Sequence, residues 1–258
     1  MLFPRIIPVL LVHDKGLVKT VKFRDPKYVG DPINAVKIFN EKEADELIVI
    51  DIDASAQGRE PDYKMIENLA TECRMPLCYG GGIKTIEQAH RILGLGVEKV
   101  ALSSIVFEKP RLITELSERV GRQSVVVVLD VKKRMFGAKY DCYTSNGKVN
   151  QKVCAFEFAQ KVQELGAGEI VINSIDNDGV MKGYDLDLIN KVKSLVSVPV
   201  TAVGGASNYN DIKNLVRAHP IIGAAAGSIF VFKGKYKAVL INYPTATEKL
   251  NILSGTVD

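Results

Sequence analysis

The stretch Glu46-Leu-Ile-Val-Ile-Asp-Ile-Asp53 recurs as Glu169-Ile-Val-Ile-Asn-Ser-Ile-Asp176, which lies 123 residues farther along the chain. The same offset places Gly81-Gly82 on Gly204-Gly205 without a gap. Chance rarely keeps register over so long a distance, and a repeat of this length indicates that one structural unit has been duplicated. The chain is therefore predicted to consist of two homologous halves.

The two halves differ slightly in length near their starts. Leu10-Leu11-Val12 matches Leu129-Asp130-Val131 at an offset of 119, so the second half carries about four extra residues before Glu169. We expect half-units of about residues 1–120 and 121–258 that together form one domain over residues 1–258.

Each half contains four short β-rich runs separated by helical patterns. Ile86–Leu93, for example, has apolar residues at helical spacing and charged residues on the other face. Alternation of strands with helices is typical of successive βα units and a parallel sheet. The predicted strands are Arg5–Val12, Leu47–Asp53, Pro76–Tyr79, Lys99–Ser103, Ser124–Asp130, Glu169–Ser174, Pro199–Val203 and Ile221–Gly227.

Eight βα units in 258 residues predict a closed (β/α)8 TIM barrel of the α/β class, built from two half-barrels. The alternative is an open doubly wound sheet, but two equal tandem halves close more naturally than they stack. Chemistry in such a barrel sits at the carboxyl ends of the strands and in the loops that follow them. This rule directs the search for functional residues.

Composition excludes several classes of protein. The chain is 47% hydrophobic and 25% charged, as expected of a globular protein with a large core. Its net charge of +4 is too slight for a nucleic-acid binder, whereas anionic small molecules remain plausible ligands. No apolar run approaches the ~18 residues of a membrane span, and the start lacks a secretory signal pattern, so we expect a cytoplasmic protein without a membrane partner.

The potential metal ligands are dispersed. The four cysteines form no CxxC pair, and the three histidines are scattered. We therefore predict no metal site, and the sequence indicates no organic cofactor.

Two glycine turns are candidate phosphate sites. One combines Gly81-Gly82 with Ser103-Ser104, and the other combines Gly204-Gly205 with Gly227-Ser228. Glycine after a strand lets the backbone approach a ligand, and the next helix offers unpaired N–H groups. Two such sites half a barrel apart suit a long bisphosphate. The alternative is that these glycines only form tight turns beside helix caps.

Asp130 is the leading candidate for acid–base catalysis. It ends a strand inside the apolar run Val125–Leu129, where partial desolvation raises the pKa of a carboxyl group. Its counterpart in the first half is Leu11, which cannot carry a proton. The other carboxylates at strand ends equally suit turn caps and loop hydrogen bonds; they are Asp14, Asp51, Asp53, Asp176 and Asp178.

Across nearly the whole chain the sequence resembles HisF, the cyclase subunit of imidazole glycerol phosphate synthase. The motifs that carry the resemblance include Arg5-Ile-Ile-Pro8, Gly30-Asp31-Pro32, Gly80-Gly-Gly-Ile83, Val125–Asp130, Gly166-Ala-Gly-Glu169, Ser174-Ile-Asp-Asn-Asp-Gly179, Gly183-Tyr-Asp185 and Gly204-Gly-Ala206. The stretch Lys233–Pro244 matches the family poorly.

The resemblance implies that ammonia from a HisH-like glutaminase enters the bottom of the barrel and reaches a two-phosphate ribonucleotide at the top. It places phosphate contacts at Gly82, Ser103 and Ser104 for one end, and at Asp178, Gly179, Gly205 and Ser228 for the other. It makes Lys19 the mobile-loop lysine. It also implies a charged gate at the tunnel entrance, formed by Arg5, Glu46, Lys99 and Glu169.

One departure from the family pattern changes the expected function. The pattern Pro-Cys-Leu-Asp-Val becomes Pro8-Val9-Leu10-Leu11-Val12, so a general acid–base group is missing from strand one. Such a group typically contributes 10²–10⁴-fold to the rate. The chain therefore resembles the HisF-like paralogues of bacterial surface-polysaccharide clusters, which occur beside a HisH-like glutaminase and an N-acetyl sugar amidotransferase. This implies delivery of ammonia for sugar amidation in lipopolysaccharide (O-antigen) biosynthesis.

Three alternatives remain open. The chain is a working histidine-pathway cyclase if Asp14 or another carboxylate replaces the missing group. It is a non-catalytic scaffold if it only binds a phosphorylated metabolite and activates its partner. A related (β/α)8 isomerase is disfavoured, because it needs two opposed carboxylates and Leu11 removes one of them.

Overall fold

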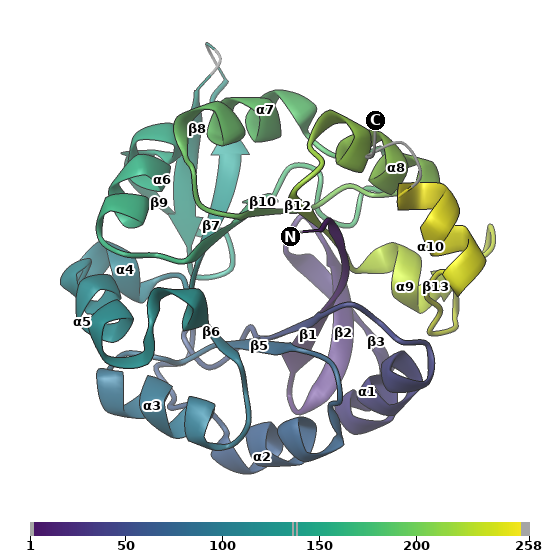
Figure 1. Cartoon of the computed structure of the whole chain (residues 1–258), viewed down its shortest axis with the longest axis horizontal. Helices are drawn as coiled ribbons and strands as arrows, with labels where there is room; N and C mark the ends of the chain where they lie inside the picture. Colours follow the sequence, from purple (N-terminus) through teal and green to yellow (C-terminus); the bar gives the residue numbers. More distant parts are fainter. Residues whose placement is uncertain (1–2, 136, 138, 254–258) are drawn as a thin grey trace.

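The computed structural model describes residues 3–135, 137 and 139–253. Eight parallel strands pair side by side in the order β10-β11-β12-β1-β4-β5-β6-β7, and pairing of β7 with β10 closes the ring (Figure 1). The predicted closed barrel is confirmed, and the open sheet is wrong. The barrel strands are β1 Arg5–His13, β4 Leu47–Asp51, β5 Leu77–Gly80, β6 Lys99–Leu102, β7 Val125–Lys133, β10 Glu169–Ser174, β11 Val200–Val203 and β12 Ile222–Ala226.

Helices surround the barrel (Figure 1). Several begin at a capping side chain: Asp31, Asp62 and Thr85, for example, each accept a hydrogen bond from an amide of the first turn. The helices of nine or ten residues each bury two or more apolar residues on one face. The helices are α1 Pro32–Glu41, α2 Tyr63–Glu72, α3 Ile86–Gly94, α4 Ile105–Glu108, α5 Arg111–Val120, α6 Ala155–Glu164, α7 Leu186–Leu195, α8 Tyr209–Ala218, α9 Ser228–Val231 and α10 Ala246–Leu253.

Two β-hairpins extend the fold at equivalent places in the two halves. After β1 the chain forms β2 (Gly16–Val21) and β3 (Arg24–Gly30), and after β7 it forms β8 (Tyr140–Thr144) and β9 (Val149–Cys154). The strand predictions did not include them. Both β1 and β7 are therefore longer than predicted, because their last residues pair with the hairpins rather than turning into a helix.

The C-terminal segment contains a third, very short hairpin, which joins β13 (Phe232–Lys233) to β14 (Ala238–Val239). Helix α10 follows and packs beside α8. No helix in the described part of the chain has both the length and the apolar character needed to cross a bilayer.

The barrel interior is a separate apolar layer inside the ring of strands. It is formed by inward-facing side chains of alternate strand residues, which is the usual filling of such barrels. Most of these side chains are aliphatic or small, and they are Ile7, Val9, Ile48, Cys78, Ala101, Val126, Val171 and Ala225.

Gly168, just before β10, is expected to tolerate no side chain. A Cβ there would lie inside van der Waals contact of the Arg122 carbonyl, which belongs to backbone and cannot move aside. Gly168→Ala should therefore lower the free energy of unfolding in urea by about 2–3 kcal/mol. The control is Gly94→Ala at the end of α3, where a Cβ meets nothing, and this change should be neutral or slightly stabilising. Equal effects in the two variants would contradict the packing argument.

Candidate active site at the barrel mouth

A cavity of about 380 Å³ lies at the carboxyl ends of the eight strands. All nine residues predicted for phosphate binding or catalysis line it, together with Leu11. The nine are Lys19, Gly82, Ser103, Ser104, Asp130, Asp178, Gly179, Gly205 and Ser228. The volume suits a drug-sized or nucleotide-sized ligand.

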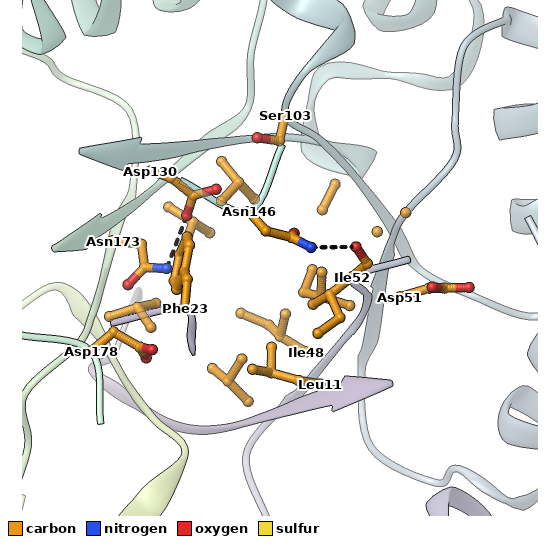
Figure 2. Close-up of a pocket in the computed structure, with 18 of the residues that line it drawn as sticks. Leu11, Phe23, Ile48, Asp51, Ile52, Ser103, Asp130, Asn146, Asn173 and Asp178 are labelled. Carbon is orange, nitrogen blue, oxygen red and sulfur yellow. Dashed lines mark hydrogen bonds between the residues drawn. The ribbon is translucent and has the colours of Figure 1, made fainter. Parts of the chain in front are cut away.

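One side of the cavity is polar and holds Asp130 (Figure 2). The Asn173 amide on β10 donates a 2.9 Å hydrogen bond to Asp130 Oδ1. Burial raises the pKa of Asp130 to about 7, against the opposing effect of the Asn173 bond, and the Asp178 carboxylate raises it further. A carboxyl group with a pKa near neutrality can both take up and release a proton in the working range. Asn173 was not predicted from the sequence.

The other side of the cavity is apolar. Figure 2 shows Leu11 and Ile48 across the cavity from Asp130, and Ile50 adds to this wall. Leu11 pairs with Ile50 between β1 and β4, as Asp130 pairs with Asn173 between β7 and β10. The duplication has therefore produced one hydrophobic and one hydrogen-bonding pair at equivalent positions.

The described carboxylates near strand one occupy positions different from that of Leu11. The Asp14 side chain is 81% exposed on the turn after β1 and does not line the cavity. Asp51 does line it, but its Oδ1 atom accepts hydrogen bonds from the amides of Asp53 and Ala54 at 2.9 and 3.0 Å. Asp51 therefore acts as a loop cap, and Asp14 lies outside the residues that line the cavity.

Lys19 reaches into the cavity from β2. Its ammonium group donates to the Val9 carbonyl at 2.5 Å, and burial lowers the pKa of the amine to about 8, against the opposing charge of Asp178. The group lies directly over Gly227, where a Cβ would collide with it. Thr20 Oγ1 donates to Asp178 Oδ2 at 3.1 Å. A cation is therefore held beside the second predicted phosphate site.

The glycine turns are required by packing as well as by any ligand. Gly82 and Gly205 have positive φ angles of 73° and 106°. A Cβ on Gly82 would lie 2.9 Å from the Arg59 carbonyl, and one on Gly205 would collide with the Gly183 carbonyl. The short helices α4 and α9, which start 123 residues apart, have no side-chain cap at their N-termini. Close backbone packing alone explains the glycines, so the phosphate assignment rests on the uncapped termini and Lys19.

At the opposite end of the barrel, the four predicted gate residues form a closed ring of ion pairs. Arg5 contacts Glu46 and lies 2.8 Å from Glu169, while Lys99 lies 2.7 Å from Glu46 and 2.9 Å from Glu169. Burial alone would raise the pKa of Glu169, but Arg5 and Lys99 outweigh it and lower that pKa to about 2. Thr201, which was not predicted, donates to Glu169 Oε1 at 2.5 Å.

A possible metal-ligand group lies outside the main cavity. His13, Asp14 and Asp53 are the one set of three such residues found close together in the described chain. However, Asp53 accepts hydrogen bonds from His13 Nδ1 at 2.8 Å and from the Asp14 amide at 2.9 Å. Arg59 lies 3.9 Å from Asp53 as well. These contacts already satisfy the carboxylate as part of an ion-pair network.

The sequence matches a known protein family. A family model described as "Histidine biosynthesis protein" matches residues 5–237. The chain belongs to this histidine biosynthesis protein family. Its resemblance to HisF is confirmed by this match together with relatives that carry HisF names.

Individual relatives agree with this membership. A Vibrio vulnificus protein provisionally named imidazole glycerol phosphate synthase subunit hisF3 is 68% identical over 253 residues, covering 98% of this chain and 97% of its own length. A Leptospira borgpetersenii protein with a provisional HisF name is 55% identical over 249 residues, with 96% and 98% coverage. The HisF subunit of Natranaerobius thermophilus is 38% identical over 243 residues, with 94% and 96% coverage.

Substitution of Lys99 should substantially lower the free energy of unfolding of this HisF-like chain. Lys99→Met leaves Glu46 and Glu169 with Arg5 as their remaining partner in the ring, and breaking a buried ion pair costs about 3 kcal/mol of unfolding free energy. The control is Lys64→Met, which removes an exposed pair with Glu67 and should cost less than about 1 kcal/mol. Urea unfolding of both variants measures the difference. A comparable loss in the two would show that the ring is not a buried network.

Asp130 should make the protein less stable as the pH rises. Its folded-state pKa of about 7 lies above the ordinary 3.8, so the folded chain binds this proton more tightly than the unfolded chain. The resulting stability is fully present below pH 3.8 and is lost as the pH rises through about 7. Asp130→Asn should therefore reduce the decline in unfolding free energy between roughly pH 5 and pH 9 by about 3 kcal/mol. Asp187→Asn, on the surface of α7, should leave the decline unchanged.

Proposed function

We propose that this HisF-like chain receives ammonia from a HisH-like glutaminase and supports formation of an amidino group on a sugar in lipopolysaccharide (O-antigen) biosynthesis. An N-acetyl sugar amidotransferase is the expected third component, and a phosphorylated small molecule is the expected ligand of the mouth cavity. The observation that carries the proposal is the apolar Leu11–Ile50 pair where a cyclase needs a second proton-transfer group.

The architecture of the barrel supports a route for ammonia. The charged ring lies at the amino ends of the strands and the cavity at their carboxyl ends, with the apolar interior between them. Part of this interior is lined by small side chains, those of Cys78, Ala101 and Ala225. Neutral ammonia loses little solvation free energy on entering such surroundings, whereas desolvation of an unpaired ammonium ion costs much more.

The difference between the polar and the apolar wall of the cavity also supports the loss of the cyclase reaction. Asp130 remains beside Asn173, but the equivalent pair across the cavity, Leu11 and Ile50, has no group that exchanges a proton. The loss of one acid–base group typically slows a reaction by 10²–10⁴-fold. The cavity keeps its lysine and its two uncapped helix ends, so binding of a phosphorylated ligand is expected to persist.

Restoring a carboxylate on strand one provides the test. In a reconstituted complex with glutaminase, glutamine and the two-phosphate ribonucleotide, Leu11→Asp should raise cyclase turnover by at least about 100-fold over the unmodified chain. Leu11→Asn, which has the same shape but cannot transfer the proton, should stay at the low level. Near-normal cyclase turnover by the unmodified chain would refute the proposal and identify a histidine-pathway cyclase.

A second measurement examines the amidation directly. With ¹⁵N-amide glutamine, the glutaminase and the sugar amidotransferase, the chain should increase ¹⁵N incorporation into the sugar nucleotide, as read by mass spectrometry. If Asp130→Asn leaves this incorporation unchanged, the chain acts as a scaffold and not as a catalyst. If the chain has no effect on incorporation, the amidation role is wrong.

A further inference from the structure

Two hairpins fold over the mouth cavity, and each is fastened to the opposite half of the barrel. The β2–β3 turn places the Lys22 amide 2.9 Å from the Asp178 carbonyl, in the loop after β10. The β8–β9 turn places the Asn146 side-chain amide 3.1 Å from the Ile52 carbonyl, in the loop after β4 (Figure 2). Because β4 and β10 are equivalent strands of the repeat, the two fastenings are related by the internal duplication.

The two hairpin turns also contact each other. A Cβ on Gly147, next to Asn146, would lie 3.2 Å from the Phe23 ring, so the ring of one turn packs against the backbone of the other. Phe23 and Asn146 both line the cavity. The turns therefore form one roof over it, with a contribution from each half.

The two fastenings differ in kind. The first uses a backbone hydrogen bond and is reinforced by the Thr20–Asp178 bond. The second crosses the mouth through the single side-chain hydrogen bond of Asn146, which at a partly exposed position contributes only about 1 kcal/mol. The second fastening is thus the weaker one, and it is the place where the roof would open first.

Asn146 suits this position for two reasons. Its φ angle of 55° lies in the left-handed region, which asparagine and glycine tolerate better than other residues. Its amide also supplies the donor that reaches Ile52. Glycine at this position would keep the backbone conformation and remove only the donor, so the contribution of the side chain can be separated from that of the turn.

We propose that Asn146 is a positioning residue that latches the β8–β9 hairpin across the mouth, and that release of this latch admits ligand while closure retains ammonia at the reacting end. The latch itself follows from the geometry alone. The retention of ammonia rests on the proposed function. Closure of this kind excludes water from a reaction site and commits the bound ligand.

The latch is tested on the whole chain without ligand by hydrogen–deuterium exchange. Asn146→Gly should raise exchange in the loop of residues 52–59, on the far side of the mouth, by about fivefold after correction for intrinsic rates. Exchange in the β2–β3 hairpin should change less. Lys148→Ala, an exposed residue of the same turn, is the matched control and should leave residues 52–59 unchanged. Unchanged exchange in Asn146→Gly, with thermal unfolding like the parent, would overturn the latch.

Retention of ammonia is tested in the complex with the glutaminase and the amidotransferase. Asn146→Gly should increase the ratio of ammonia released into solution to nitrogen incorporated by a few fold. If exchange at residues 52–59 rises and this ratio does not, the latch stands but its role in retention is wrong. If the parent complex incorporates no nitrogen, the proposed function fails while the exchange result still decides the latch.

Discussion

Closure of the parallel sheet by pairing of β7 with β10 is the constraint on which the other features depend. This pairing aligns Asp130 with Asn173 and gives the barrel a single mouth at which all eight carboxyl ends meet. It also brings Glu169, at the start of β10, into reach of Arg5 and Lys99 at the opposite end. One set of backbone hydrogen bonds thus fixes both the candidate site at the mouth and the ring of ion pairs at the opposite end, with an apolar interior between them.

Within this frame the two halves have diverged in the chemistry of equivalent side chains. The first half presents Leu11 and Ile50 to the cavity, and the second presents Asp130 and Asn173. A ligand held between them meets an apolar wall on one side and, on the other, a carboxyl group whose pKa is about 7. The backbone is shared by both sides, so this difference in function requires no difference in fold.

Much of this arrangement could be predicted from the sequence because the signals were local and repeated. Strands such as Glu169–Ser174 are recognisable as short apolar runs, and the offset of 123 fixes their number and order. The carboxyl-end rule then selects Asp130 and Asp178 as residues of the mouth. Asn173 could have been found by the same rule, since it lies at the end of a predicted strand and is the counterpart of Ile50.

Other features depended on contacts between distant segments. The hydrogen bond from Asn146 to Ile52 joins residues 94 positions apart through a turn that carries no motif. The hairpins were missed because their strands lack a long apolar run, and one of them, Arg24–Gly30, is mostly exposed. Capping by Asp51 likewise depends on the path of the loop after β4, which the residue type alone does not specify.

The ring at the base of the barrel has a consequence for how this sequence can change over time. Its two cations and two carboxylates balance one another, so each member is electrically compensated by neighbours from other strands. Replacing a single member with a neutral residue leaves an unmatched charge in a confined place. Replacing one cation and one carboxylate together keeps the charges of the ring balanced. Substitutions at these four positions should therefore be correlated, so that related proteins differ at two of the positions together or at none of them.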